Sequence, residues 1–244
     1  MELNQTLNIP QDNIFKEMLE AGVYYGHRKT KTHPRMRPYI FSTRNSIELI
    51  NLEATLVFLD KAKDFLKEKI SQGASVLMVA TQPAAQKVIE DSAKKYNFPY
   101  MTERWLGGTL TNFKVINQRM TYYSDLKTKK EQGELDKYTK KERLKIDKEL
   151  TKLEKAFSGL INLNKLPDIL FVVDVIEHQT AVREAIRLNI PIVAVMSTDC
   201  DPKAVDYPIV ANDHSRTSIE WIMKYLEPAF KGPDDKIQVL KDNG

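Results

Sequence analysis

The densest group of cations and imidazoles lies in a stretch of the chain that has no carboxylate. No Asp or Glu occurs between Glu20 and Glu48. The basic side chains of this stretch are His27, Arg28, Lys29, Lys31, His33, Arg35, Arg37 and Arg44, and its aromatic ones are Tyr24, Tyr25, Tyr39 and Phe41. Cations neutralise phosphates and aromatic rings stack on exposed bases, so this composition favours RNA as the ligand. The alternative is a solvated basic loop that faces an acidic patch of the same protein.

Carboxylates and imidazoles follow several predicted strands and are the candidates for catalysis. They are Asp174, Glu177, His178, Asp199, Asp201, Asp213 and His214. Such groups hold Mg²⁺ or act as acid and base at the carboxyl ends of parallel strands. Asp also caps helices and opens turns, and Asp201-Pro202 and Asp213-His214-Ser215 have the spacing for those roles. We favour capping and predict no catalytic residue.

Motifs for phosphate, metal and thiol chemistry are missing from the sequence. Neither the G-x-G-x-x-G nor the G-x-x-x-x-G-K-[ST] pattern occurs. His27 and His33 lie six residues apart with no cysteine nearby, which argues against zinc. Cys200 is the single cysteine, so a disulfide within the chain is excluded. We therefore expect no metal and no cofactor.

Composition is that of a folded soluble protein. The chain has 244 residues, a formal net charge of +4 and 42% hydrophobic residues, enough for a buried core. No apolar run approaches the roughly 18 residues of a membrane span, and residues 1–11 do not have the pattern of a secretory signal. A cytosolic protein is the expectation.

Strands and helices alternate in two parts of the chain. Apolar runs predict strands at 75–80, 98–102, 168–174, 191–196 and 208–211, with helices at 83–96, 177–188 and 215–226. This order is typical of an open parallel α/β sheet. The N-terminal part has a predicted helix at 12–21 ended by Gly22, a loop in which Pro34 and Pro38 exclude helix, a strand at 47–52 and a helix at 53–70.

Two further helices with narrow apolar seams separate these parts. Apolar residues recur every three or four positions over 109–126 and over 139–160. Thr139 and Glu142 form a capping box at the start of the second helix. The Lys127–Lys155 region mixes eleven cations with seven carboxylates, as expected for solvated helix faces. The pattern predicts an antiparallel hairpin that projects roughly 25–30 Å from the sheet.

The predicted organisation has five parts. They are an N-terminal helix and basic loop (1–44), the first part of the α/β domain (45–108), a coiled-coil hairpin insertion (109–162), the second part of the α/β domain (163–230) and a flexible tail (231–244).

Ordered motifs along the chain resemble a known family. Residues 104–113 (RWLGGTLTNF) are similar to the signature of the bacterial form of the second protein of the small ribosomal subunit. Further matching motifs follow in the family's order: 19–27, 34–36, 38–41, 50–53, 166–168, 190–191, 198–202 and 211–213. The resemblance covers about residues 12–228. Departures from the pattern occur at Tyr24-Tyr25, at Thr32, at Gln82 and at His214.

The resemblance implies a fold class and a role. It implies an α/β, flavodoxin-like open parallel sheet with an inserted antiparallel coiled-coil hairpin. It also implies a structural, non-enzymatic protein that binds small-subunit ribosomal RNA near the junction of head and body. Neighbouring ribosomal proteins are implied partners, including the first protein of the subunit, whose docking assists mRNA binding. Neither a membrane nor a homo-oligomer is expected, and the ribosome can be that of a bacterial cytoplasm or of an organelle.

Two groups of residues are predicted to bind RNA. The first is the basic set His27, Arg28, Lys29, Lys31, His33, Arg35, Arg37 and Arg44, and the second is Arg104, Trp105, Thr111, Asn112 and Lys114. Trp105 has two interpretations, since it can cover the root of the hairpin or stack on RNA. Thr109 or Thr111 is expected to cap the first hairpin helix, after a turn at Gly107-Gly108.

Two other function classes compete with this one. A nucleotide- or metal-dependent α/β enzyme would use Asp174, Asp199 and Asp213. This sequence has no phosphate-loop motif for such an enzyme, and an enzyme would not need the hairpin. A coiled-coil interaction adaptor explains the hairpin but not the basic stretch.

Overall fold

A five-stranded parallel sheet forms the centre of the protein. The computed structural model describes residues 13–231, with the side chains of residues 136 and 137 left out. The strands are β4 (Val76–Val79), β5 (Tyr100–Met101), β6 (Ile169–Val173), β7 (Ile192–Met196) and β8 (Tyr207–Val210). Their spatial order is β5-β4-β6-β7-β8, all parallel. Counted from one, this is the order 2-1-3-4-5 of doubly wound sheets, so the predicted α/β sheet is confirmed.

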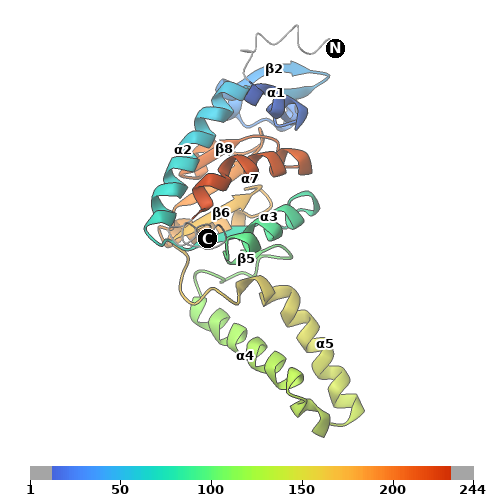
Figure 1. Cartoon of the computed structure of the whole chain (residues 1–244). Coiled ribbons are helices and arrows are strands. Elements are labelled where there is room, and N and C mark those ends of the chain that lie inside the picture. Colours follow the sequence, from blue (N-terminus) through green and yellow to red (C-terminus); the bar gives the residue numbers. More distant parts are fainter. Residues whose placement is uncertain (1–12, 232–244) are drawn as a thin grey trace, which may run out of the picture.

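Helices cover both faces of this sheet. On one face lie α2 (Leu52–Ser71), α3 (Pro83–Lys95) and α7 (Arg216–Phe230), as Figure 1 shows. On the other face lie α6 (Gln179–Arg187) and the segments at the root of a helix pair. Side chains alternate between the two layers: Phe171 packs with the first layer, and Leu170 and Val172 pack with the second. All five residues of β6 are buried, which explains why the sequence there is uniformly apolar.

The N-terminal part forms a small antiparallel sheet. The helix α1 (Asn13–Glu20) precedes the sheet. Its strands are β1 (Tyr25–Arg28), β2 (Ile40–Arg44) and β3 (Ile47–Ile50), in the spatial order β1-β3-β2. Gly22 ends α1 with φ +72°, as predicted. Asn212, after β8, bonds to the backbone oxygens of Gly22 and Val23, so this sheet lies beyond the β8 edge.

The prediction that Pro34 and Pro38 exclude helix from the basic loop was wrong. Short 3-10 helices at Lys29–Lys31 and Pro34–Tyr39 connect β1 to β2, and Pro38 lies inside the second of them. A 3-10 turn of a few residues tolerates proline because few of its N–H groups have a partner to lose. Met36, which is fully buried, fixes this turn to the body. All but one residue of β2 is exposed, so no alternation of apolar and polar residues marked it as a strand.

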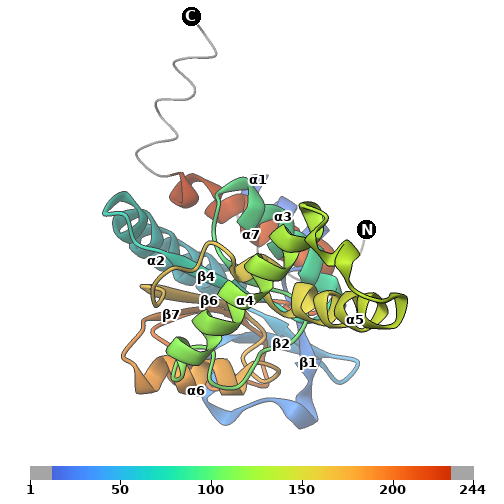
Figure 2. The ribbon, with the colours of Figure 1, turned by 90° about the horizontal axis from the view of Figure 1, so that it is seen from below.

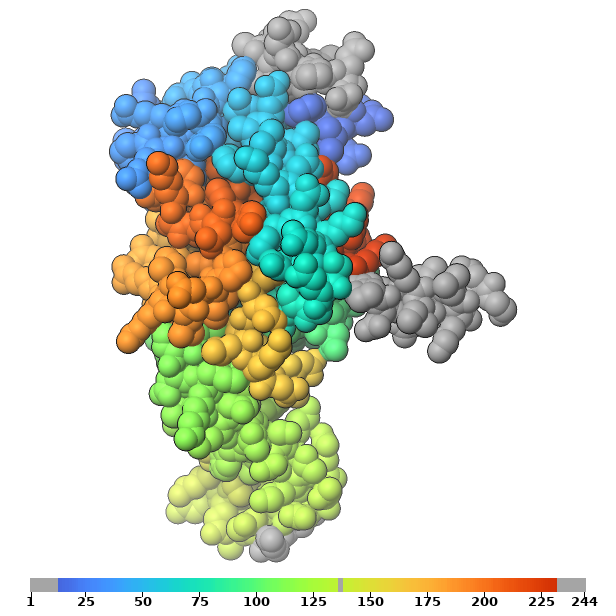
Figure 3. All heavy atoms as spheres, turned by 90° about the vertical axis from the view of Figure 1, so that its left-hand side faces the viewer, coloured from blue at the N-terminus to red at the C-terminus, as the bar shows by residue number. Residues whose placement is uncertain are grey.

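Two long helices extend away from the sheet. They are α4 (Phe113–Glu131) and α5 (Lys140–Phe157), connected through Gly133 (φ +74°) and the 3-10 turn Glu134–Lys137. Figures 1 and 3 show the pair as an extension at the end opposite the N-terminal sheet, and in Figure 2, seen from below, the pair lies in front of the parallel sheet. The predicted seam is buried on α4 at Ile116, Met120, Tyr123 and Leu126, and on α5 at Leu150 and Phe157.

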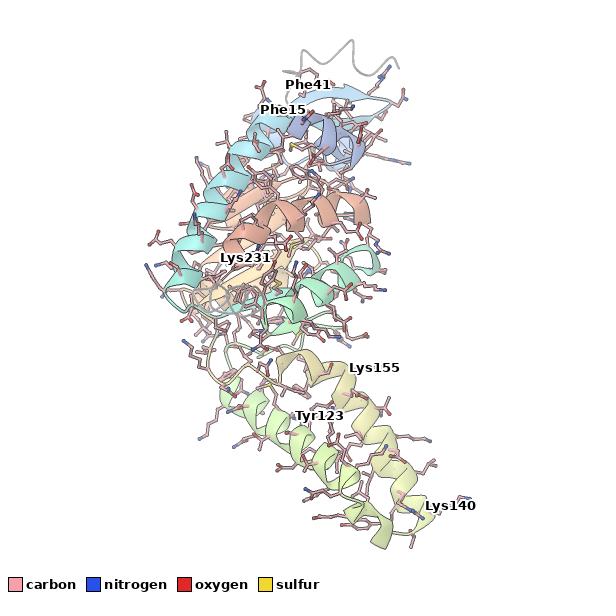
Figure 4. All side chains as sticks on the ribbon, viewed as in Figure 1. Phe15, Phe41, Tyr123, Lys140, Lys155 and Lys231 are labelled. Atoms are coloured by element: carbon pink, nitrogen blue, oxygen red, sulfur yellow. The ribbon has the colours of Figure 1, made fainter. Side chains whose placement is uncertain are left out.

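Polar contacts flank this seam. Lys130 pairs with Asp147 at 2.7 Å across the two helices, and Glu142 accepts hydrogen bonds from the backbone and hydroxyl of Thr139, the predicted capping box. In Figure 4, Tyr123 lies between the helices whereas Lys140 and Lys155 point to solvent. Within residues 13–231, no helix is both long and apolar enough to cross a membrane.

Residues 1–12 of the predicted first region and residues 232–244 of the predicted tail lie outside the described residues.

Candidate nucleic-acid interface

Exposed cations gather on the N-terminal sheet and its 3-10 turns. The exposed ones are Arg28, Lys29, Lys31, Arg35, Arg37 and Arg44. Among residues 13–231, only Arg35 of this set forms an ion pair, with Asp201. The other five carry charges that no carboxylate of the described chain neutralises at close range. Phosphates are the chemical groups that such a surface attracts.

Two histidines of the predicted set are not on this open surface. His27 is half-buried in β1, with Nε2 3.4 Å from Oδ2 of Asp199 and its backbone N–H bonded to Thr198. His33 donates its backbone N–H to the oxygen of Thr198 and accepts the N–H of Arg35 on its ring. Both histidines therefore attach the N-terminal sheet to the segment after β7.

Gly26 allows this attachment. A Cβ at Gly26 would lie 2.6 Å from Cγ2 of Thr198 and 3.1 Å from the backbone oxygen of Glu48. The Gly26-His27 pair belongs to strand β1. Close packing against Thr198 and Glu48 requires glycine here.

The second predicted group lies at the start of the helix pair. Arg104, Thr111, Asn112 and Lys114 are exposed and Trp105 is half-buried. This segment follows β5, whereas the basic surface lies beyond β8 at the opposite edge of the sheet. The structure does not bring the two groups together.

A buried carboxylate that the sequence analysis missed holds this segment. Oε1 of Glu184 accepts from the Trp105 indole N–H at 3.1 Å and from the Gly108 N–H at 2.8 Å. Oε2 accepts from the N–H groups of Leu110 and Thr111, each at 3.0 Å, and from the Thr111 hydroxyl at 3.1 Å. Burial alone would raise the pKa of Glu184, but these hydrogen bonds outweigh it and hold the pKa below its usual range.

The hydrogen bonds from residues 105–111 to Glu184, called the Glu184 clamp from here on, change the roles predicted for Trp105, Thr109 and Thr111. Trp105 packs against the core and uses its indole N–H on Glu184, which favours the interpretation that it covers the root of the hairpin. Neither Thr109 nor Thr111 caps α4: Asn112 precedes the helix, and Thr109 donates to the oxygen of Leu106. A signal for Glu184 existed, because it interrupts the apolar face that Ala181 and Ala185 form on α6.

Two of the acidic residues after the strands stabilise turns, as we favoured. Asp174, with φ +69°, accepts the N–H groups of Ile176 and Glu177, and Asp201 accepts that of Lys203. His178 contacts the backbone oxygen of Asp174 through Nδ1 at 2.7 Å and accepts the Thr81 N–H on Nε2. Backbone groups therefore occupy the ring of His178 and carboxylate oxygens of Asp174 and Asp201.

Asp213 differs from the other acidic residues. It does not cap α7, which was expected, but places Oδ1 2.6 Å from Nδ1 of His214. It is 1% exposed, and burial raises its pKa, as do the nearby charges of Asp174 and Asp199. The hydrogen bond with Asp213 in turn raises the pKa of His214.

Comparison with known proteins decides the identity of this fold. The family described as ribosomal protein S2 matches residues 18–232. The chain belongs to the ribosomal protein S2 family. The RWLGGTLTNF segment held by Glu184 lies inside the matched region, so the resemblance inferred from the motifs is confirmed.

Curated relatives of the S2 family match nearly the whole chain. The small ribosomal subunit protein uS2 of Dictyoglomus thermophilum is 43% identical over 222 residues, which is 91% of this chain and 90% of the relative. That of Dehalococcoides mccartyi (strain CBDB1) is 39% identical over 233 residues, 96% of this chain and 95% of the relative. The small ribosomal subunit protein uS2 of Mycobacteroides abscessus is 40% identical over 215 residues, which is 88% of this chain and 78% of the relative. Members of this family are ribosomal proteins and not enzymes, so the enzyme alternative is set aside.

Proposed function

We propose that this S2-family protein is a structural constituent of the small ribosomal subunit and binds ribosomal RNA through its N-terminal sheet. The observation that carries the proposal is the set of five exposed cations without an ion pair in the described chain: Arg28, Lys29, Lys31, Arg37 and Arg44. Relatives named as small ribosomal subunit proteins, similar over about nine-tenths of the chain, support the assignment.

Exposed aromatic rings on the same sheet support RNA over other polyanions. Phe41 is 49% exposed and Tyr25 is 42% exposed, beside the cations of β1 and β2. Rings next to cations provide stacking for unpaired bases together with neutralisation of the backbone. Arg104, Asn112 and Lys114 form a second, separate contact in this proposal, whereas Trp105 and Thr111 act by shaping the segment that presents them.

The finer assignments follow from the resemblance described above. The parallel sheet is flavodoxin-like, and α4 and α5 form an antiparallel coiled-coil hairpin inserted between its two halves. The protein lies near the junction of head and body of the subunit and helps to dock the first protein for mRNA binding. Its location is the ribosome of a bacterial cytoplasm or of an organelle.

The RNA surface can be tested by the salt dependence of binding. Small-subunit ribosomal RNA is titrated at several salt concentrations with the full-length protein and with the triple variant Arg28→Ala, Lys29→Ala, Lys31→Ala. Each lost phosphate contact lowers the slope of log affinity against log salt by about 0.7 to 0.9. We expect weaker binding and a slope reduced by about 2 to 3.

A matched control removes the same charge elsewhere. Lys61 and Lys67 on α2 and Lys87 on α3 are exposed, and their replacement by Ala also removes three positive charges. We expect this control to bind RNA nearly as the unmodified protein does. Equal losses in both triple variants would mean that only net charge matters and would contradict the proposed surface.

A further inference from the structure

A groove with aromatic and aliphatic walls lies between α1, α2 and α7. Its volume is about 420 Å³. The residues that shape it are Ile14 of α1, Lys63 of α2, and Trp221, Lys224, Tyr225 and Pro228 of α7. The RNA surface proposed above uses none of these residues, so the groove needs a separate account.

Two stacked rings form one wall of this groove. Trp221 and Tyr225 lie one helical turn apart on α7, with ring centroids 5.4 Å apart and planes tilted by 21°. Their polar edges already have partners. The indole N–H of Trp221 donates to Glu17 at 3.2 Å, and the hydroxyl of Tyr225 donates to Asp60 at 2.6 Å. The rings therefore offer apolar faces to a ligand, which suits aliphatic and proline side chains.

Two lysines lie beside the rings. Lys63 places its ammonium nitrogen 4.3 Å from the centre of the Tyr225 ring, and Lys224 is exposed. Within residues 13–231, neither lysine forms an ion pair with a carboxylate. A ligand that carries aliphatic groups together with carboxylates therefore complements the groove.

We propose that residues 7–10 of this chain's own N-terminal segment occupy the groove. Asn13, with which the described part of the chain begins, lines the groove, so the preceding residues start at its edge. Residues 1–12 contain two carboxylates, Glu2 and Asp12, and neither lysine nor arginine. The aliphatic side chains of this segment are Leu3, Leu7, Ile9 and Pro10.

The reach of the segment matches the length of the groove. Ile9 lies four residues before Asn13, which is about 13 Å in an extended chain. Trp221 and Pro228 lie seven residues apart on α7, which is about 10 Å along the helix. A proline favours an extended backbone in the residue before it, and extended proline-containing segments dock in aromatic grooves. The segment around Ile9 can therefore reach both ends of the groove.

Covalent linkage favours this occupant over others. A segment tethered at the edge of the groove has an effective concentration in the millimolar range, so weak apolar contacts are enough to hold it. A free peptide or a second copy of the chain needs a higher affinity for the same occupancy. Docking of the segment covers the Trp221 ring and brings carboxylates toward Lys63 and Lys224.

Acrylamide quenching of tryptophan fluorescence tests this proposal in the full-length protein. The test variant carries Leu7→Asp and Ile9→Asp. Burial of each aliphatic side chain favours the docked segment at least about tenfold, so the double change should weaken docking about a hundredfold. We expect stronger quenching of Trp221 and emission at longer wavelength. The chain has two tryptophans, so the same pair of changes is also made in Trp221→Phe, where the remaining Trp105 should not respond.

Asn4→Asp with Gln5→Asp is the matched control. It adds the same charge to the segment without removing an aliphatic side chain, so Trp221 quenching should stay unchanged. Equal quenching in the Leu7→Asp, Ile9→Asp variant and the unmodified protein would overturn the proposal. Protection of Trp221 that increases with protein concentration would assign the groove to a second copy and would also overturn it. Neither readout involves RNA, so the result is independent of the proposed ribosomal function.

Discussion

Two regions of this molecule each contain a buried carboxylate, and the two carboxylates differ in their hydrogen bonds and in the direction of their pKa shift. Glu184, at the root of the helix pair, accepts five hydrogen bonds, and its pKa lies below the usual range. Asp213, under the N-terminal sheet, has one bonded oxygen and one orphaned oxygen, and its pKa is raised. Burial is similar, at 8% and 1% exposure. The number of donors that face each group makes the difference.

This difference follows from the groups that surround each carboxylate. The donors of Glu184 come from the chain itself, so the signature segment 104–112 is complete without a ligand. Asp213 lies among Asp174 and Asp199, which repel its charge, and only His214 compensates for it. A carboxylate with many donors stabilises the fold, whereas a buried one with an unpaired oxygen lowers its stability.

The largest effect is expected at the satisfied carboxylate. Glu184→Ala would leave the N–H groups of Gly108, Leu110 and Thr111 without their acceptor. We expect the free energy of unfolding to fall by about 3 kcal/mol or more, measured by urea denaturation. Glu177→Ala, at an exposed position just before α6, is the control and should change it by less than about 0.5 kcal/mol. Equal effects in the two variants would refute the clamp.

A smaller loss of stability is expected at Gly26, where the N-terminal sheet packs against the segment after β7. Gly26→Ala puts a methyl group 2.6 Å from Thr198 Cγ2 and 3.1 Å from the backbone of Glu48, so β1 must shift. We expect the free energy of unfolding to fall by about 1 to 3 kcal/mol, measured by urea denaturation. Gly107→Ala meets no atom within 4 Å and should be nearly neutral. A neutral Gly26→Ala would mean that β1 is loosely held.

The pH dependence of stability sharpens the comparison. The folded pKa of Glu184 lies below its unfolded value of about 4.3, so its stabilisation is complete above that pH and is lost as the pH falls through the folded pKa. The difference in unfolding free energy between the unmodified protein and Glu184→Gln should therefore shrink below about pH 4.3. Denaturation at pH 3 to 7 measures it. A difference that grows on acidification would contradict the assigned charge state.

The smallest effect is expected at the unsatisfied carboxylate. Asp213→Asn removes a buried carboxylate that two neighbouring carboxylates repel and retains an oxygen beside His214. We expect the free energy of unfolding to change by less than about 1 kcal/mol, measured by the same denaturation. A loss as large as that of Glu184→Ala would show that the Asp213 carboxylate stabilises the fold as Glu184 does.

The pattern of apolar residues in the sequence predicted the helices and strands in which buried residues recur at regular intervals. The strands of the parallel sheet and the seam of α4 and α5 appeared at nearly their final positions, because every residue of β6, or every third to fourth residue of α4, is buried. Among the N-terminal strands, the one predicted at 47–52 is β3, whereas β1 and β2 were not predicted. β2 is almost wholly exposed, so its sequence has no alternation of apolar and polar residues.

Sites formed by distant residues could not be predicted from spacing. The exposed cations were found because they are neighbours in sequence. Glu184 reaches a segment more than seventy residues away, and His27 meets His214 only after the sheets have packed. Capping was predicted correctly for Asp174 and Asp201, whose partners are local, and failed for Asp213, whose surroundings are not.

The most direct test of the central claim is sedimentation of cell lysates that contain tagged protein, unmodified or with Arg35→Glu and Arg37→Glu. We expect the unmodified protein to migrate with small ribosomal subunits and to remain there at moderate salt. The charge-reversed variant, with the same thermal unfolding midpoint, should move to the light fractions. Normal incorporation of that variant at physiological salt would contradict the assignment of the N-terminal sheet as the RNA surface.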